Sequence, residues 1–446
     1  MLLITDVTVV TVDATRRVIP DGAIVVDGAR IVAVDSAVAL RARHPEAEVL
    51  QGAGMVAIPG LIDAHAHADQ SILRGTTDNL PWIPFLDDWI EPYLRRREPA
   101  DTVAAYRLAA LEMIKGGTTC FLSPNVDATD DLGALVDATG DIGVRGVLAH
   151  WVTPDADLDA AVERVTRWHG ADDDRVQLWF GLMVPRRPGD VCAVDFYPAV
   201  AARAAEIGTG ITYHFCSEIE DLEYYVDTFG VRPAMWAAGN GALGSNVVLI
   251  NCCWMDDAEI AVLAETGTHA VYSPSATAKM ATGITPAVAM LEAGVNVALG
   301  TDGGANNNSH DMIREMKTAC LVQNSAVRHA GALTAEAALE LATIGGARAI
   351  GRADDLGSIE TGKRADIVLV DLQRPHTTPV NDVVSSLVFS AHGGDVDTVF
   401  VDGRVVMRNR EVVGVDEATV MADAGRAAAR VRASVLPPHA PRWSGG

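Results

Sequence analysis

The sequence is poor in cysteine, in aromatic residues and in positive charge. Among 446 residues there are six cysteines, none in a CxxC pair, and aromatic residues make up 5%. Scattered cysteines indicate a reduced chain rather than a disulfide framework. Lys and Arg number 35 against 59 Asp and Glu, which gives a net charge of −24. This charge repels nucleic acid and anionic membrane surfaces, so we expect neither as a partner.

Long hydrophobic runs are also lacking. No apolar stretch reaches the roughly 20 residues that cross a bilayer, so we predict no membrane span. The opening stretch MLLITDVTVVTVD lacks the basic start and the long apolar run of a signal peptide. We therefore expect a cytoplasmic protein. With 49% hydrophobic and 21% charged residues, the composition is typical of a compact soluble enzyme.

The two ends of the chain share a β-hairpin pattern. AIVVDGARIVAV contains two β-rich runs joined by Asp27-Gly28, and VDTVFVDGRVVM turns at Asp402-Gly403. Asp-Gly suits a tight hairpin turn because both residues tolerate positive φ. We predict that residues 1–55 and 361–446 pair into one small satellite β domain, which neither could form alone.

The segment between them, residues 56–360, alternates short apolar runs with alanine-rich helical stretches, as βα units around a parallel sheet do. Eight runs are strand candidates: Val56 to Ala64, Thr118 to Leu122, Arg145 to His150, Val176 to Met183, Gly210 to Cys216, Val247 to Cys252, His269 to Ser273 and Val295 to Thr301. Eight strands predict a closed barrel whose chemistry lies at the carboxyl ends of the strands. An open doubly wound sheet is the alternative, but no GxGxxG follows any of the strands.

Metal-ligand residue types stand at three of these strand ends. His65 and His67 close the first strand, His214 lies near the end of the fifth, and Asp302 follows the eighth. Residues two apart on an extended chain face the same way, so both histidines of the HAH motif can turn towards one ion. A lone HxH is weak evidence, but polar ligands at matching strand ends favour a metal site.

The chain resembles the amidohydrolase superfamily, and more closely its cytosine deaminase-like branch of guanine, cytosine and methylthioadenosine deaminases and triazine hydrolases. The resemblance covers nearly the whole chain and depends on PGLIDAHAH, LEMIKGGTT, YSPSATAKMATGITP, GTDGGANNN and GSIETGKRADIVLVDL. It implies an α/β fold, a distorted TIM (β/α)8 barrel with a small β-sandwich built from both chain ends. It also implies one divalent metal ion, zinc or sometimes iron.

Carried over residue by residue, the family's metal ligands are His65, His67, His214 and Asp302. The resemblance implies that Asp302 also accepts a proton from a metal-activated water, while Glu218 passes one to the substrate. The reaction would replace the amino group of a purine, pyrimidine, pterin or triazine ring by a carbonyl, releasing ammonia. Two-metal branches use a lysine on the fourth strand, and RVQLWFGLMV contains none.

The chain departs from the branch at two positions. Many of its deaminases show HxxE on the fifth strand, whereas HFCSEIED gives HxxxE if Glu218 is the acid. Residues four apart can share a strand face, and Glu220 stays an alternative. On the sixth strand Asn251 stands where relatives commonly carry a histidine, and a neutral amide cannot hold a proton at neutral pH.

Substrate contacts are expected from Gln70, Trp82, Asn251 and Asn306. Guanine deaminase and the triazine hydrolases carry a glutamine similar to Gln70, whereas methylthioadenosine deaminases hold the ribose with a glutamate after the next segment's proline. Here Tyr93 and Leu94 follow Pro92, which favours a free base or a triazine-like ring over a nucleoside.

Several other residues have a structural and a functional interpretation. Trp82, Phe85 and Trp89 form either an aromatic wall or, as burial tendencies favour, core packing. His150 and His310 either line the pocket or are buried and hydrogen-bonded, and His269 is more typical of packing or surface. The pair Cys252 and Cys253 has no basic neighbour and is expected to be buried and unreactive.

Three functional classes remain, and we predict the first, a hydrolytic deaminase. The second is a hydrolase of another C–N or C–Cl bond, such as a triazine chlorohydrolase, an alkylaminohydrolase or a cyclic amide hydrolase. The third is a non-catalytic scaffold, which retention of all four candidate ligands disfavours. Because homo-oligomers are common for this architecture, we also expect a dimer or a higher oligomer.

Overall fold

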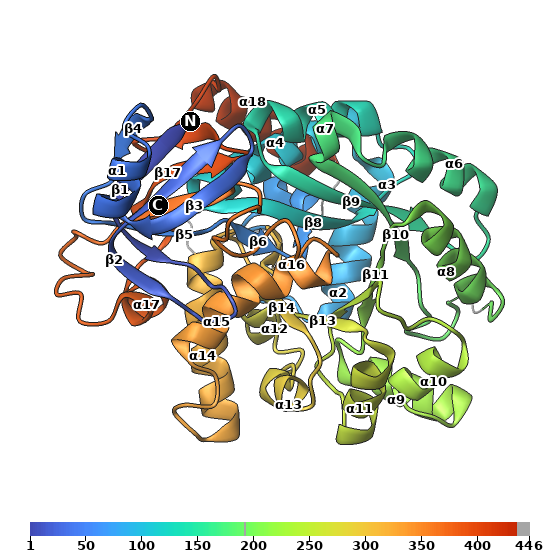
Figure 1. The fold of residues 1–446 in the computed structure, drawn as a ribbon. Helices are drawn as coiled ribbons and strands as arrows, with labels where there is room; N and C mark the ends of the chain where they lie inside the picture. The colour runs from blue at the N-terminus through green and yellow to red at the C-terminus, as the bar shows by residue number, and fades with distance from the viewer. Residues whose placement is uncertain (191–192, 435–446) are drawn as a thin grey trace, which may run out of the picture.

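Eight parallel strands form the barrel in the computed structural model, which describes residues 1–190 and 193–434 (Figure 1). In hydrogen-bonded order they are β6 Leu61–Asp63, β8 Thr118–Val126, β9 Arg145–Val152, β10 Val176–Leu182, β11 Ile211–Phe215, β12 Val247–Asn251, β13 His269–Tyr272 and β14 Val297–Leu299. The predicted α/β barrel is confirmed, and seven of the eight predicted strands lie within a few residues of their expected positions.

The barrel closes where its first and last strands meet. Ala64 N donates to Leu299 O at 2.9 Å, and Asp302 N donates to His65 O at 2.8 Å. Just beyond, the short strands β7 Ala66–His67 and β15 Asp302–Gly303 pair in parallel. Closure therefore brings the residues after the first strand beside those after the eighth, although they are far apart in sequence.

The first predicted strand, Val56 to Ala64, is wrong as a single strand. Its first half is β5 Met55–Pro59, which pairs with β1 and β16 of the satellite sheet, and only β6 belongs to the barrel. Gly60 separates the two because the chain passes very close to Thr119, whose Oγ1 would lie 2.0 Å from a Cβ at this position. An uninterrupted apolar run contains no signal that its halves enter different sheets.

The satellite domain is one nine-stranded sheet that contains both chain ends. Its strands are β1 Leu2–Val10, β2 Val18–Asp27, β3 Arg30–Ser36, β4 Glu48–Gln51, β5, β16 Ile367–Asp371, β17 Val396–Val401, β18 Arg404–Arg408 and β19 Glu411–Val412. The antiparallel pairing of β5 with β16 joins the two ends. A separate core of the sheet draws residues from both, including Ile4, Ile24, Ile367 and Phe400.

Both predicted Asp-Gly turns are present, and they touch. Gly28 and Gly403 have φ of 57° and 69°, the left-handed conformation that favours glycine. A Cβ on Gly403 would lie 2.2 Å from Gly28 O, so the two hairpins pack directly against each other. The sheet thus folds its two outer hairpins together.

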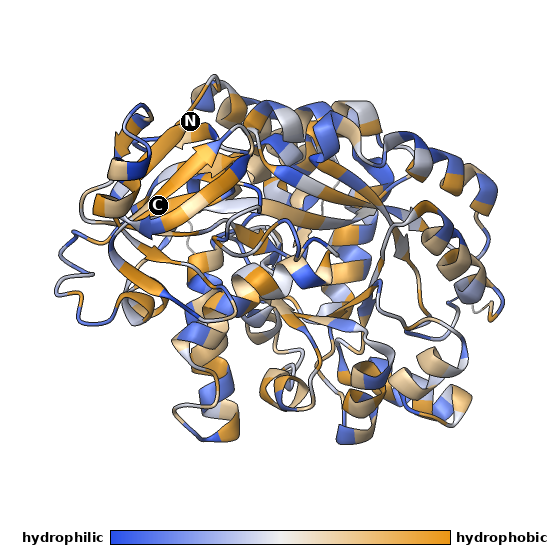
Figure 2. Cartoon of the chain, viewed as in Figure 1, coloured by the Kyte–Doolittle hydropathy of each residue, from blue (hydrophilic) through white to orange (hydrophobic). Residues whose placement is uncertain are grey.

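The helices cover the outside of the barrel and alternate hydrophobic and hydrophilic residues, whereas the satellite strands are largely hydrophobic (Figure 2). The longer ones are α4 Pro99–Lys115, α5 Leu132–Ile142, α6 Leu158–Trp168, α8 Phe196–Ile207, α9 Ile219–Phe229, α11 Asp257–Thr266 and α14 Met312–Val327. Shorter elements include η1 Ala68–Leu73, α2 Trp82–Phe85, the π-helix η2 Leu86–Ile90, α3 Glu91–Arg96, α10 Pro233–Gly239, α12 Pro274–Met280 and α13 Ala287–Glu292. No helix among the described residues is long and apolar enough to span a bilayer.

The C-terminal helix α18 Glu417–Ser434 corrects the predicted extent of the satellite domain. It packs on α4 and η1 of the barrel. Its residues Ala424 and Val431 share a hydrophobic cluster with Ile72 and Tyr93. Residues 361–446 therefore do not all belong to the β domain, because an alanine-rich helix finds its apolar partner on the barrel.

Candidate active site

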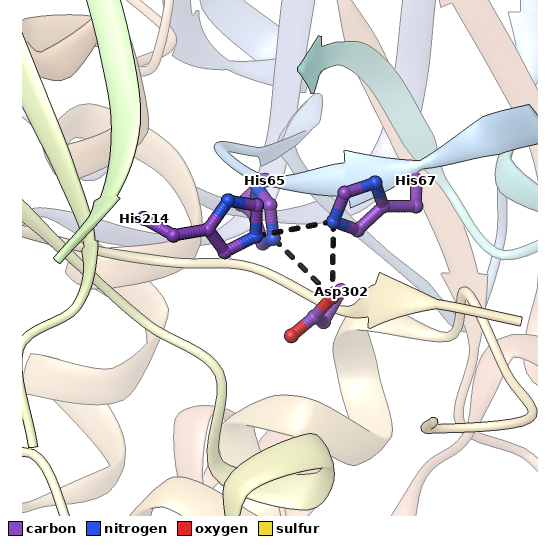
Figure 3. A group of neighbouring side chains, drawn as sticks. All are labelled: His65, His67, His214 and Asp302. Carbon is purple, nitrogen blue, oxygen red and sulfur yellow. Dashed lines mark hydrogen bonds and ion pairs between the residues drawn. The ribbon is translucent and has the colours of Figure 1, made fainter. Parts of the chain in front are cut away.

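Three imidazoles and one carboxylate face one another at the carboxyl ends of the barrel strands (Figure 3). His65 and His67 follow β6, His214 lies on β11, and Asp302 begins β15. The Nε2 atoms of His67 and His214 are 3.2 Å apart. Asp302 Oδ1 lies 3.3 Å from His65 Nε2 and 3.6 Å from His67 Nε2. The structure thus brings together all four side chains that the sequence singled out, with their ligand atoms within 4.8 Å of one another.

The chemistry of these side chains fits a divalent metal ion. Neither ring nitrogen of His65 hydrogen-bonds to another described residue, nor does Asp302 Oδ1. Burial lowers the pKa of His67 to about 3 and that of His214 well below its usual value, so both imidazoles are neutral. Burial would raise the pKa of Asp302, but the adjacent imidazoles outweigh this and keep it below its usual range. Neutral imidazoles and an ionised carboxylate are the forms that bind zinc or iron.

A second layer of buried polar residues holds the cluster in place. Asp63 accepts hydrogen bonds from His65 N at 3.3 Å and from Thr301 N at 2.9 Å. His310 lies 2.9 Å from Thr301 Oγ1 through Nδ1 and 3.0 Å from Ser71 Oγ through Nε2. His310, which the sequence left open as a pocket residue, therefore lies behind the cluster, joining the loops that follow the first and eighth strands.

A cavity of about 350 Å³ opens beside the cluster. His67, His214 and Asp302 line it, and so do all four predicted substrate contacts: Gln70, Trp82, Asn251 and Asn306. The side-chain oxygens of Gln70 and Asn251 are buried without a hydrogen-bond partner among the described residues, so both are available to a ligand. Asn306 Oδ1 instead accepts from Gly303 N at 2.7 Å and shapes the loop.

The predicted aromatic set divides between the cavity and the core. Trp82 and Phe85 line the cavity, with stacked rings whose centroids are 5.8 Å apart. Trp89 is 6% exposed and packs in the same hydrophobic cluster as Ile72 and Tyr93. One segment therefore contributes Trp82 and Phe85 to the wall of the cavity and Trp89 to the hydrophobic core.

Glu218 does not share a strand face with His214, contrary to expectation. The strand β11 ends at Phe215, Cys216 has a φ of 47°, and Glu218 is the N-cap residue of α9. The expectation assumed that the extended strand continues to Glu218, with side chains alternating between its two faces. The turn after Phe215 ends this alternation. Glu218 is buried, which raises its pKa to about 8, but the described residues that line the cavity include Glu220 and Asp221 rather than Glu218.

Asn251 is held by a residue that sequence reasoning missed. Its Nδ2 donates to Ser217 Oγ at 3.1 Å, and its backbone has a φ of 75°. Ser217 lies three residues after His214, at the position where the branch commonly carries its glutamate. The two departures from the family pattern are therefore one hydrogen-bonded pair.

Two consecutive arginines of the loop after β10 were also missed. Arg186 forms a bidentate ion pair with Asp221 at 3.0 and 2.8 Å, and its Cζ lies 5.0 Å from the ring centroid of Trp82. Arg187 pairs with Asp87 at 2.7 Å and with Glu91 at 2.8 Å. Both line the cavity. The two adjacent positive charges in VPRRPGD, directly after a predicted strand, were the sequence signal that could have identified these arginines.

The remaining candidates lie outside the catalytic cavity. The ring of His150 lies 3.2 Å from Val126 O and lines a second cavity, whereas His269, at the other end of β13, contacts Ser245 O at 3.2 Å. Cys252 and Cys253 are buried, and burial raises the pKa of the Cys253 thiol to about 12. These thiols are therefore protonated and unreactive, as expected.

Comparison with known proteins identifies the class. Residues 56–406 match the amidohydrolase family, and residues 22–47 match a bacterial imidazolonepropionase-like composite domain. A 5-methylthioadenosine/S-adenosylhomocysteine deaminase of Moorella thermoacetica is 35% identical over 94% of this chain and 97% of that protein. A 5'-deoxyadenosine deaminase of Methanosarcina mazei is 33% identical over 97% and 99%.

A solved structure agrees with these relatives. An adenosine deaminase from Xanthomonas campestris with bound zinc superposes with a TM-score of 0.90 at 30% identity, covering 97% of this chain and 98% of that one. The barrel and its cluster of histidines with an aspartate define a metal-dependent hydrolase of C–N bonds. The chain belongs to the amidohydrolase family.

Proposed function

We propose that this amidohydrolase deaminates an adenine nucleoside, with water as the second substrate and ammonia as a product. The observation that carries the proposal is the cluster of three imidazoles and one carboxylate beside a cavity with two amide oxygens that have no hydrogen-bond partner among the described residues. The deaminases of Moorella thermoacetica and Methanosarcina mazei, named for adenine nucleosides, support this substrate class.

The choice of a nucleoside revises the expectation of a free base. That expectation used Tyr93 and Leu94, but Tyr93 is fully buried and its hydroxyl donates to Asp69 O, so only Leu94 of the two lines the cavity. Glu91, on the other side of Pro92, lines the cavity and offers a carboxylate that can accept from sugar hydroxyls. It already accepts from Arg187 at 2.8 Å, which holds it in position.

His65, His67, His214 and Asp302 would hold the metal ion, with zinc as the first choice and iron as the alternative. When bound, such an ion lowers the pKa of a water molecule from 15.7 to about 7 and so supplies the nucleophile at neutral pH. The structure has one such cluster beside the cavity, among the residues it describes, which fits a single ion.

The chain's own residues would then bind the ring and move the protons. The Asp302 carboxylate accepts a proton from the attacking water, because it is ionised. Glu218, whose pKa of about 8 keeps it protonated at neutral pH, is the proposed donor to a ring nitrogen and assists the departure of ammonia. Glu220, which lines the cavity where Glu218 does not, is the alternative donor. Gln70 and Asn251 offer oxygens that accept hydrogen bonds from the amino group of the base, while Trp82 and Phe85 pack on the ring faces.

A substrate panel with metal analysis on the same preparation tests the proposal. Adenosine, 5'-deoxyadenosine, S-adenosylhomocysteine, free purines, pyrimidines, pterins and triazines are assayed for ammonia, and the metal content is measured by mass spectrometry. We expect one divalent ion per chain and ammonia from the nucleosides. Chloride or an alkylamine from triazines would favour the other hydrolase class, and a metal-free inactive protein would favour a scaffold.

We also propose a cytoplasmic homo-oligomer, a dimer or higher. The five described cysteines are buried and free, which fits a reducing compartment. Light scattering of the purified protein measures the oligomeric state directly.

A further inference from the structure

A second group of metal-ligand side chains lies at one end of the satellite sheet, outside the catalytic cluster. His376 follows β16, His392 precedes β17, and Asp395 ends the short 3-10 helix η5 Gly393–Asp395. The strands β16 and β17 are antiparallel neighbours, so the chain leaves one strand and enters the next at the same end of the pair. This pairing brings His376 beside His392 and Asp395, with ligand atoms within 4.8 Å of one another.

The two imidazoles of this group repeat the arrangement of two rings in the catalytic cluster. The rings of His376 and His392 are stacked, with centroids 4.9 Å apart and an interplanar angle of 11°. The rings of His67 and His214 are stacked in the same way, with centroids 5.2 Å apart and the same angle of 11°. In both places a buried carboxylate lies beside the pair of rings. The local geometry is therefore one that this chain also uses for its predicted metal ligands.

The distances within the group suit one tetrahedral ion. Ligand atoms that lie 2.0–2.2 Å from a tetrahedral zinc ion are about 3.3–3.6 Å from one another. Asp395 Oδ2 lies 2.9 Å from His376 Nε2 and 3.7 Å from His392 Nδ1, on either side of that range. The two imidazoles are 41% and 43% exposed, so their rings can move by the few tenths of an ångström that an ion requires.

The hydrogen bonds of the group leave its ligand atoms usable by an ion. Asp395 Oδ2 is fixed in place because it accepts from His392 N at 3.0 Å. His392 Nδ1 accepts from Gly394 N at 3.0 Å, so this nitrogen carries no proton, as a metal ligand must not. His376 Nε2 lies 2.9 Å from Asp395 Oδ2 and would exchange this one hydrogen bond for a bond to the ion.

The charge of Asp395 also favours a cation. Its side chain is 4% exposed, and among the described residues its ion pairs are with His376 and His392 only. No lysine or arginine of the described chain therefore provides a permanent counter-charge. A buried carboxylate without such a partner is costly, and a divalent ion would supply the missing positive charge.

We propose that His376, His392 and Asp395 form a second metal site, which binds a divalent transition-metal ion such as zinc with water as the fourth ligand. The ion ties together the two ends of the connection between β16 and β17. The site has three protein ligands and is partly exposed, whereas the catalytic cluster has four buried or nearly buried ligands, so the second site fills at higher zinc concentrations. Zinc that saturates only the catalytic cluster leaves it empty, and protein prepared without added zinc carries one ion per chain.

Zinc titration of the untagged protein by calorimetry tests the proposal. The number of ions bound per chain is measured in the wild type, in His376→Ala and in His329→Ala, which alters an exposed histidine outside both groups. We expect the wild type and His329→Ala to bind one ion more than His376→Ala does. This difference of one ion is independent of whether the catalytic cluster is already loaded, and of which substrate it takes. Equal numbers in the wild type and His376→Ala would overturn the proposal.

Cobalt spectroscopy identifies the ligands in a second way. Cobalt(II) is added to the zinc-loaded wild type, His376→Ala and Asp395→Asn, and the visible absorption of tetrahedral cobalt is recorded. Asp395→Asn retains an oxygen that can accept from His392 N, and circular dichroism verifies that both variants are folded. We expect the band in the wild type and its loss in both variants. A band of equal strength in the folded variants would place the ion elsewhere and contradict the proposed site.

Discussion

Protonation of a few buried side chains decides what this site can do. Burial lowers the pKa of His67 to about 3 and raises that of Glu218 to about 8 and that of Asp63 to about 7. The imidazole keeps a lone pair available, while the glutamate keeps a proton available at neutral pH. Burial disfavours the charged form of each group, so it lowers the pKa of the base and raises the pKa of the acid. The histidine is therefore a neutral metal ligand, and the glutamic acid is a proton donor.

Replacing Glu218 with glutamine tests its role as the proton donor. We expect Glu218→Gln to retain the metal and to lose at least about 10²-fold in kcat, because an amide cannot supply the proton. Steady-state kinetics and metal analysis on the same sample measure both. Glu223→Gln is the control, since Glu223 lies on the same helix, is exposed and does not line the cavity, and a fully active Glu218→Gln enzyme would contradict the role.

The pH dependence provides an independent check on Glu218. Its pKa of about 8 is above the usual value of 4.5, so the donor form is present below about pH 8 and is lost as the pH rises through it. The wild-type rate should therefore fall on the alkaline side near pH 8. If the rate of Glu218→Gln fell in the same way near pH 8, a group other than Glu218 would be responsible for the fall.

At the scale of elements, the satellite sheet is fastened to the barrel by a buried ion pair. Arg145 begins β9 and is 2% exposed, and its Nε donates to Asp366 Oδ2 at 2.7 Å. Its Nη2 also pairs with Asp402, in the turn between β17 and β18. One guanidinium thus links a barrel strand to two segments of the C-terminal sheet, which can hold the two hydrophobic cores in register.

Removal of Arg145 should destabilise the whole chain. We expect Arg145→Ala to lower the free energy of unfolding by about 3–5 kcal/mol, because it leaves the buried Asp366 carboxylate without its counter-charge. Denaturant unfolding followed by circular dichroism measures the change. Arg203→Ala, which removes an exposed arginine paired with Asp159 and Glu206, should leave the unfolding curve nearly unchanged. Equal effects of both variants would mean that the linkage contributes little.

At the scale of the whole molecule, the metal cluster lies at the closure of the barrel. Its ligands come from the ends of the first, fifth and eighth strands, and two of these ends pair through β7 and β15. An ion bound there would cross-link the strands that close the barrel. Metal binding is therefore expected to stabilise the entire fold as well as to supply chemistry.

Chelation should accordingly lower the melting temperature, and added zinc should restore it. Free zinc at about 1,000 times its Kd contributes about 4 kcal/mol, because the folded chain binds the ion and the unfolded chain does not. Calorimetry of the chelated and reloaded protein measures the shift. His65→Ala should not respond to zinc, whereas His269→Ala, which alters a histidine outside the cluster, should respond as the wild type does. An equal response of His65→Ala would remove His65 from the binding site.

The sequence predicted more of the fold than of the site's surroundings. Short stretches of sequence were enough to predict the strand positions, both Asp-Gly turns and the ligand residue types. These features depend on local alternation, turn chemistry and residue type. The pairing of Asn251 with Ser217, the two arginines after β10 and the course of the chain at Glu218 involve contacts between different loops. Such contacts depend on how strands end and turn, which a short stretch does not reveal.

By itself the sequence determined that this chain forms a (β/α)8 barrel with a β domain from both ends, and which four residues would meet at its mouth. Tertiary structure alone decided that the first apolar run divides at Gly60 between two sheets, that Glu218 caps a helix, and that Asn251 pairs with Ser217. The physical reason is the separation along the chain of the residues that interact. Residue type and periodicity act over a few neighbours, whereas barrel closure and the packing of adjacent strands join residues that are far apart in sequence.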